Sequence, residues 1–160
     1  MLDPDDRVLL VRFEFPTASV WGLPGGGVEA TEDPVSALRR ELAEELGLVD
    51  TPVGPHVWDR LHLVTFDHGD PTRGLGGRWD GQQDQVHLVR TDHFEPSPQL
   101  SWAELRAERV HEMRWWTVPE IADHPGRFAP RHLADHLAVL LRDGPPPTPL
   151  DTSDPPATTN

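Results

Sequence analysis

The side chains best suited to chemistry lie between residues 32 and 45, where four glutamates accompany Arg40. At about 100° per residue, Glu41, Glu44 and Glu45 would share one arc of a helix, beside its apolar stripe. Three carboxylates this close repel one another and raise one another's pKa, so the arrangement requires a cation. Because no histidine or cysteine accompanies them, they suit an ion that prefers oxygen ligands, Mg²⁺ or Mn²⁺.

Two neighbouring features support this site. Arg40 lies four residues before Glu44 and can pair with it, which would hold that carboxylate in place. Residues 21–27 (WGLPGGG) contain a proline and three successive glycines, which disfavour helix and sheet and predict a loop before the helix. The alternative is an acidic face on a surface helix that is merely solvated.

The full spacing decides against that alternative. Gly26, five residues, Glu32, seven residues and then residues 40–48 (RELAEELGL) resemble the signature of the Nudix hydrolases at every defined position. The resemblance implies an α/β fold, an α/β/α sandwich around a mixed central sheet. It also implies metal-dependent hydrolysis of a nucleoside diphosphate linked to another group.

The resemblance also implies a role for each matched residue. Glu41, Glu44 and Glu45 would be metal ligands, Glu32 an auxiliary acid, Arg40 the residue that orients a glutamate, and Gly25, Gly26 and Gly27 the loop that lets substrate phosphates approach closely. The catalytic base would be one of these glutamates or an acid from the loop before the last core strand, which offers Glu95, Glu104, Glu108 and Glu112. We favour Glu108, which makes Glu44, Glu45 and Glu108 the catalytic candidates.

The elements that must position these residues follow from periodicity. Apolar residues at spacings of three and four predict a helix over residues 35–46, with Asp33 as N-cap and Gly47 as its stop. Strands are predicted at residues 7–13, 56–66, 83–90 and 112–117, a capping box opens a helix at Thr117, and a last helix covers residues 130–142. Residues 100–110 could be a short helix or an ordered loop.

A long connection, residues 67–82, joins the two middle strands and is rich in glycine and aspartate. Such a length is unusual for a hairpin loop and points to function or mobility. Trp79 and Arg78 lie in it, and we expect them to bind the substrate, with Trp79 stacking on its base. The alternative is an idle exposed loop.

Composition limits the remaining possibilities. The chain has 160 residues, which predicts a single domain, residues 1–143, and a proline-rich disordered tail, residues 144–160. The absence of cysteine excludes disulfides and thiolate-bound metals. A net charge of −13 is opposite to that of a nucleic-acid binder, so no nucleic-acid partner is expected. No apolar run reaches the roughly 20 residues of a membrane helix, so we expect a cytoplasmic protein without a membrane partner.

The start of the chain departs from the Nudix pattern. Nudix domains usually place another strand before the one predicted at residues 7–13, whereas six residues precede it here. Either the sequence begins downstream of its true start, or the edge of the sheet is left short or completed by a second copy of the chain, as a homodimer.

Together these observations predict a Mg²⁺-dependent hydrolase, with Mn²⁺ as a substitute. Its substrate would be a small nucleoside diphosphate derivative, namely a nucleoside triphosphate, ADP-ribose or a nucleotide sugar. The products would be a nucleoside monophosphate and a phosphorylated compound or pyrophosphate. The alternative function is a Nudix-like module that binds a nucleotide without cleaving it.

Overall fold

Strands and helices follow one another in the order expected of an α/β domain. The computed structural model describes residues 1–62 and 82–153. The strands are β1 (Val8–Phe15), β2 (Ala18–Gly22), β3 (His56–His62), β4 (Gln82–His87), β5 (Val110–Trp116), β6 (Arg127–Ala129) and β7 (Leu150–Asp151). The helices are α1 (Pro34–Leu46), α2 (Trp102–Ala107), α3 (Val118–Asp123) and α4 (Leu133–Asp143).

The strands form two sheets, with the orders β5-β1-β2-β6 and β4-β3-β7. In the first sheet β1 is antiparallel to β2 and β5, whereas β6 is parallel to β2, so the sheet is mixed. Two isolated β-bridges near the start of the chain connect β1 with the segment that follows β4. Leu2 pairs with Val8 on one side and with Arg90 on the other. Residues 1–3 therefore take a strand-like place beside the start of β1 with a partner on each side, and a homodimer stays a prediction.

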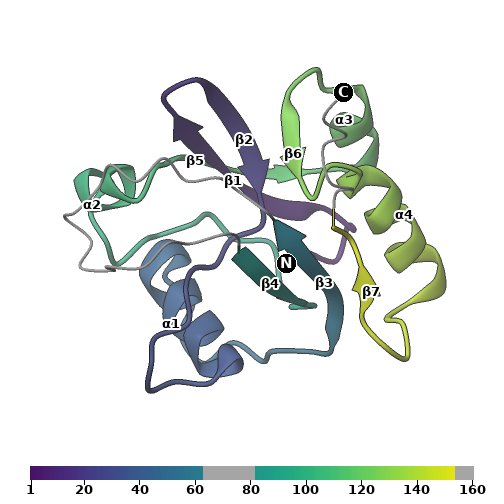
Figure 1. Ribbon diagram of the computed structural model, residues 1–160, viewed down its shortest axis with the longest axis horizontal. Helices are drawn as coiled ribbons and strands as arrows, with labels where there is room; N and C mark the ends of the chain where they lie inside the picture. The colour runs from purple at the N-terminus through teal and green to yellow at the C-terminus, as the bar shows by residue number, and fades with distance from the viewer. Residues whose placement is uncertain (63–81, 154–160) are drawn as a thin grey trace, which may run out of the picture.

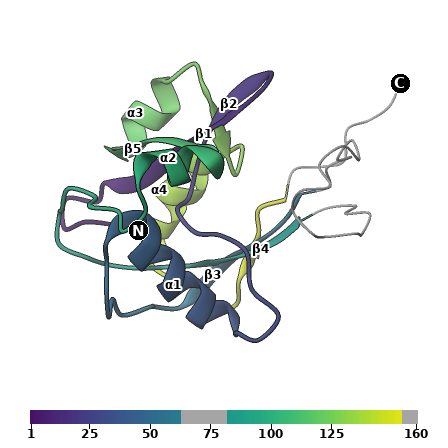
Figure 2. The same cartoon turned by 90° about the vertical axis from the view of Figure 1, so that its left-hand side faces the viewer.

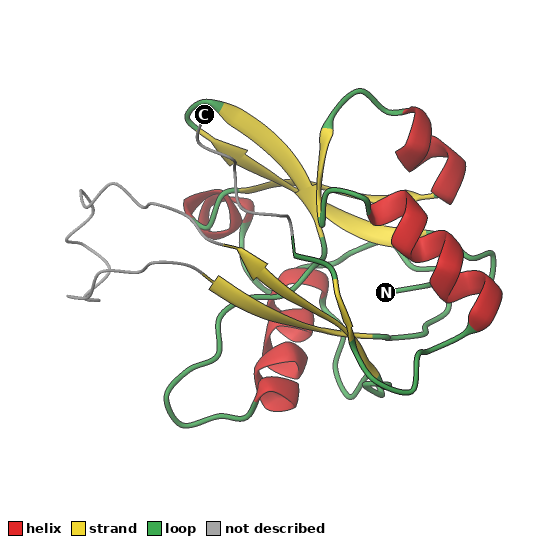
Figure 3. Cartoon of the chain, turned by 45° about the vertical axis from the view of Figure 1, so that its right-hand side comes forward, coloured by secondary structure: helices red, strands yellow, loops and turns green. Residues whose placement is uncertain are grey.

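The alternation of side chains along β1 distributes the core over two layers. Leu9 packs with Leu42 and Leu46 of α1, whereas Leu10 faces the other way and packs with Leu137 of α4. The sheets thus lie between α1 on one side and α3 and α4 on the other (Figures 1 and 3). The predicted α/β/α sandwich with a mixed sheet is confirmed. No helix in the described part of the chain is long and apolar enough to cross a membrane.

Most predicted elements are present with shifted ends. The helix over residues 35–46 and the strand at residues 112–117 are confirmed, and residues 100–110 contain the short helix α2. Trp21 and Gly22 were expected in a loop, but they end β2. Their pairing with β1 explains the difference. The two residues belong to a strand because they have partners in β1, although their local sequence disfavours a strand. The connection with Arg78 and Trp79 lies outside the described residues.

The predicted disorder of the tail is wrong for residues 144–153. β7 runs parallel to β3, and Thr152 is buried, with its amide nitrogen and its hydroxyl both donating to the carbonyl oxygen of Asp59 at 2.8 and 3.1 Å. The amide nitrogen of Leu61 donates to the hydroxyl oxygen of Ser153 at 2.7 Å. A tail with few apolar residues is ordered here because backbone groups at the edge of β3 supply the hydrogen bonds. Residues 154–160 lie outside the described residues.

Deletion of residues 145–160 is expected to lower the free energy of unfolding by about 2 kcal/mol, because several hydrogen bonds to β3 are lost. Urea unfolding followed by tryptophan fluorescence measures the change. Deletion of residues 154–160 alone is the matched control, since it removes none of these bonds. Equal stability of the two truncated proteins would contradict a stabilising role for β7.

Candidate active site

The helix α1 carries the site, and local sequence determines both of its ends. The Asp33 carboxylate accepts hydrogen bonds from the amide nitrogens of Val35 and Ser36 at 3.0 and 3.1 Å, as an N-cap should. Gly47 ends the helix with a φ of 75°, in the left-handed region. A Cβ at Gly47 would also lie 2.1 Å from the carbonyl oxygen of Ser97, so only glycine allows this loop to approach. These caps place the glutamates of α1 on one arc, as the spacing predicted.

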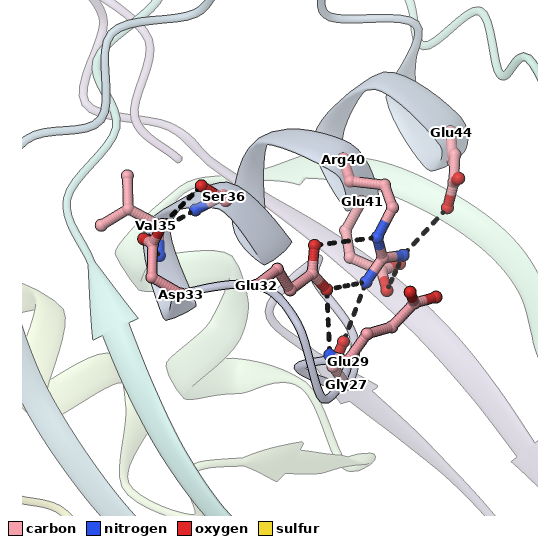
Figure 4. A network of polar contacts seen from close by, with 9 residues as sticks. All are labelled: Gly27, Glu29, Glu32, Asp33, Val35, Ser36, Arg40, Glu41 and Glu44. Carbon is pink, nitrogen blue, oxygen red and sulfur yellow. Dashed lines mark hydrogen bonds and ion pairs between the residues drawn. The ribbon is translucent and has the colours of Figure 1, made fainter.

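Arg40 organises the acids around it (Figure 4). Its guanidinium pairs with Glu32 at 2.7 Å, with Glu41 at 2.8 Å and with Glu44 at 3.2 Å. It also donates to the carbonyl oxygen of Gly27 at 2.9 Å. The predicted pairing of Arg40 with Glu44 is confirmed, but the shorter contacts go to Glu32 and Glu41. Hydrogen bonding with Arg40 lowers the pKa of Glu32, and the same contacts raise the pKa of Arg40.

The glycine loop packs directly against two of the carboxylates. The amide nitrogen of Gly25 donates to Oε2 of Glu45 at 3.2 Å. A Cβ at Gly26 would lie 2.1 Å from Oε1 of Glu41, so the absence of a side chain is what allows this contact. The glycine loop and α1 are therefore in contact through the carboxylate oxygens of Glu41 and Glu45. A sequence pattern cannot reveal the Gly25 contact or the Gly27 contact with Arg40, because both use backbone atoms.

Burial changes the acidity of the inner glutamates. Glu45 is 3% exposed, and desolvation raises its pKa to about 7, with the charges of Glu41, Glu108 and Glu44 adding to the effect. The hydrogen bond from Gly25 acts in the opposite direction but is weaker. Desolvation likewise raises the pKa of Glu41, against the effect of Arg40. The site thus holds buried negative charge that its own residues only partly compensate.

Among the four acids predicted for the loop before β5, of which Glu112 lies within β5 itself, Glu108 acts on this site. It is the C-cap of α2, and its charge raises the pKa of both Glu41 and Glu45. Glu104 instead closes the capping box of α2 with Ser101, and Glu112 pairs with Arg12 at 3.0 Å. Glu95 is exposed. The charge of Glu108 therefore affects the glutamates of α1, whereas Glu104 and Glu112 have other partners.

Comparison with known proteins shows the family of this chain. A family model of the NUDIX domain matches residues 1–137. The chain belongs to the Nudix family. It is 31% identical over 117 residues to Nudix hydrolase 25 of Arabidopsis thaliana, an overlap that covers 72% of this chain and 67% of that protein.

Two further Nudix proteins extend the comparison. Over 48 residues the chain is 54% identical to putative 8-oxo-dGTP diphosphatase 2 of Mycobacterium tuberculosis, which covers 29% of this chain and 34% of that protein. The chain thus spans about a third of the length of this relative. The crystal structure of a MutT NUDIX hydrolase from Burkholderia pseudomallei superimposes with a TM-score of 0.51 at 27% identity, covering 86% of this chain and 90% of that one.

The acids of this Nudix site fit a divalent cation by their chemistry. Glu41 and Glu45 are buried carboxylates, and oxygen is the ligand that Mg²⁺ and Mn²⁺ prefer. Desolvation raises the pKa of Glu45, so a cation beside this carboxylate would stabilise its charged form. Within residues 1–62 and 82–153, however, no three acidic or histidine side chains are arranged to hold an ion as they stand. Arg40 donates hydrogen bonds to one oxygen of Glu41 and to one oxygen of Glu44.

Replacing Gly26 with alanine tests the packing of the loop. We expect the free energy of unfolding to fall by about 1–2 kcal/mol, because a methyl group would push the Glu41 carboxylate away from Arg40. Gly27→Ala is the control, since a Cβ there meets no atom within 4 Å. Chemical denaturation of both variants without added metal gives the comparison. Equal stability of the two variants would show that Gly26 is not packed against Glu41.

Proposed function

We propose that this Nudix protein hydrolyses the diphosphate linkage of a small nucleoside diphosphate derivative with the help of Mg²⁺, which Mn²⁺ can replace. The observation that carries the proposal is the buried carboxylate of Glu45. Its pKa is raised to about 7, chiefly by burial and in addition by the negative charges of Glu41 and Glu108. A structural role would favour an apolar side chain at such a position, because an uncompensated buried charge is costly. A cation removes that cost.

In this proposal Glu41, Glu44 and Glu45 hold the metal. When bound, the ion would supply charge neutralisation at the nonbridging phosphate oxygens and would acidify a water molecule. Arg40 restrains the directions that Glu41 and Glu44 can take, since one guanidinium contacts both side chains. The amide nitrogen of Gly25 occupies one lone pair of Glu45 Oε2, which leaves its remaining lone pairs for other partners.

The remaining chemistry falls to Glu108 and the glycine loop. Glu108 is exposed at the end of α2, where its carboxylate can accept the proton of the attacking water. A Cβ at Gly27 would have no atom within 4 Å, so the space beside this residue is open. Phosphate oxygens can therefore approach its backbone. With a net charge of −13, the protein would repel a polyphosphate without the cation.

The substrate candidates are nucleoside triphosphates, ADP-ribose and nucleotide sugars. Similarity to a protein named as an 8-oxo-dGTP diphosphatase supports a nucleoside triphosphate, although that match covers 34% of the relative. The expected products from a triphosphate are the nucleoside monophosphate and pyrophosphate. ADP-ribose and nucleotide sugars would instead release a nucleoside monophosphate and a sugar phosphate.

The test is incubation of the purified protein with Mg²⁺ and each candidate substrate, with products identified by mass spectrometry. Release of a nucleoside monophosphate that depends on Mg²⁺ and is lost in Glu45→Gln is the expected result. Tight binding of a nucleotide without cleavage would overturn the hydrolase and support a binding module. Equal turnover with and without EDTA would overturn the role of the metal.

A further inference from the structure

The turn that follows α2 has an unusual backbone conformation. Arg109, directly after Glu108, has a φ of 72°, in the left-handed region. Within the described residues, the other non-glycine residues with positive φ are Asp6 and Asp50. Aspartate tolerates this region because its short polar side chain bonds locally, whereas arginine has no such advantage. The surroundings of Arg109 must therefore impose its conformation.

Contacts with the end of β1 supply that constraint. The amide nitrogen of Glu14 donates to the carbonyl oxygen of Arg109 at 2.9 Å. The guanidinium carbon of Arg109 lies 5.4 Å from the centre of the Phe15 ring, in a cation–π contact. On either side of the turn, Leu105 and Val110 are fully buried in one cluster. The chain is thus held before and after Glu108.

The start of the same segment is fixed on α1. The amide nitrogens of Gln99 and Leu100 both donate to the carbonyl oxygen of Glu44, at 2.9 and 3.2 Å. The helix α2 therefore lies between α1 and the hairpin of β1 and β2, as two perpendicular views agree (Figures 1 and 2). One end of the segment is set by the helix that carries the metal-binding candidates, and the other end is set by Arg109.

We propose that Arg109 is a positioning residue for Glu108: its left-handed conformation, held against the end of β1, ends α2 and fixes the place of Glu108 on a segment whose start is bound to the carbonyl oxygen of Glu44. The inference rests on the proposed function in one respect, since it takes Glu108 as the base. It assigns Arg109 no contact with the substrate.

Two substitutions separate the backbone effect from the loss of the guanidinium. Arg109→Gly removes the side chain but accepts the left-handed conformation, whereas Arg109→Val removes it and disfavours that conformation. We expect kcat to fall about tenfold in Arg109→Val at unchanged KM, and to stay within about threefold of the wild type in Arg109→Gly. Where Arg109→Val does not fold, Arg109→Ala takes its place. Equal kcat in the valine (or alanine) and glycine variants would overturn the proposal.

A double-mutant cycle with Glu108→Gln tests whether Arg109 acts through Glu108. On that background we expect Arg109→Val to change kcat by less than about twofold. An undiminished tenfold loss would show that the two residues act independently and would overturn the positioning role. Wild-type kcat in Glu108→Gln alone would overturn it as well, because no base would then need positioning.

A second measurement does not depend on turnover. The affinity for Mn²⁺ alone, followed by the electron paramagnetic resonance of the free ion, reports the negative charge near Glu41 and Glu45. We expect Glu108→Gln and Arg109→Val each to weaken Mn²⁺ binding by about threefold, and Arg109→Gly to leave it unchanged. If no substrate is hydrolysed but this pattern holds, the proposed function fails while the positioning role stands. Unchanged Mn²⁺ affinity in Arg109→Val overturns the positioning role.

Discussion

Glu45→Gln is expected to lower kcat by about three orders of magnitude, because it removes a buried carboxylate from the proposed metal site. The amide keeps the size of the side chain but carries no charge, so the affinity for Mg²⁺ should fall together with kcat. Steady-state kinetics over a range of Mg²⁺ concentrations, with isothermal titration of Mn²⁺, separates these two effects. Activity restored at high Mg²⁺ would place the whole loss in metal binding.

The fold of this variant should be unaffected. Glu45 is 3% exposed and its pKa is about 7, so the buried site already accepts a neutral side chain at mildly acidic pH. Glu95→Gln is the matched control, since it makes the same chemical change at an exposed position of the loop before β5. We expect Glu95→Gln to keep wild-type kcat. Turnover of a folded Glu45→Gln at more than a tenth of the wild-type rate would contradict the metal assignment.

The contribution of Glu45 to the stability of the metal-free protein is expected to fall as the pH rises from about 4.5 to about 7. In this window the folded protein keeps a proton on Glu45, whereas the unfolded chain releases it near the ordinary value of 4.5. The folded state therefore binds more protons, and the free energy of unfolding falls with increasing pH. A pKa shift of this size lowers the free energy of unfolding by about 3 kcal/mol at most. Glu41, whose pKa is also raised, acts in the same direction.

Urea unfolding in EDTA at pH 5 and pH 8 measures this dependence, and Glu45→Gln provides the reference. The difference in pH dependence between wild type and variant isolates the contribution of Glu45 to stability. Groups with a lowered pKa, such as Asp3 and Glu32, are common to both proteins and cancel. We expect the variant to gain relative stability at pH 8, and added Mg²⁺ to restore the wild type there. An equal pH dependence of the two proteins would show that Glu45 is not desolvated.

Local sequence alone determined the helix that carries the site. Asp33 caps its start and Gly47 ends it, and both caps bond to backbone atoms within one or two turns. The arc of Glu41, Glu44 and Glu45 follows from helical geometry, as does the pairing of Arg40 with Glu44. Such features are predictable because their partners are close in sequence and their geometry repeats.

Only the tertiary structure decided the chemistry of these groups. The burial that raises the pKa of Glu45 exists only in the folded chain, where a loop twenty residues earlier contacts this carboxylate, even though the hydrogen bond from Gly25 itself lowers that pKa. The charge of Glu108 reaches α1 because distant segments meet, and residues 144–153 are ordered because β3 offers an unpaired edge. Pairing and desolvation depend on which distant atoms approach. A helical period or a capping residue carries no information about them, whereas the folded backbone does.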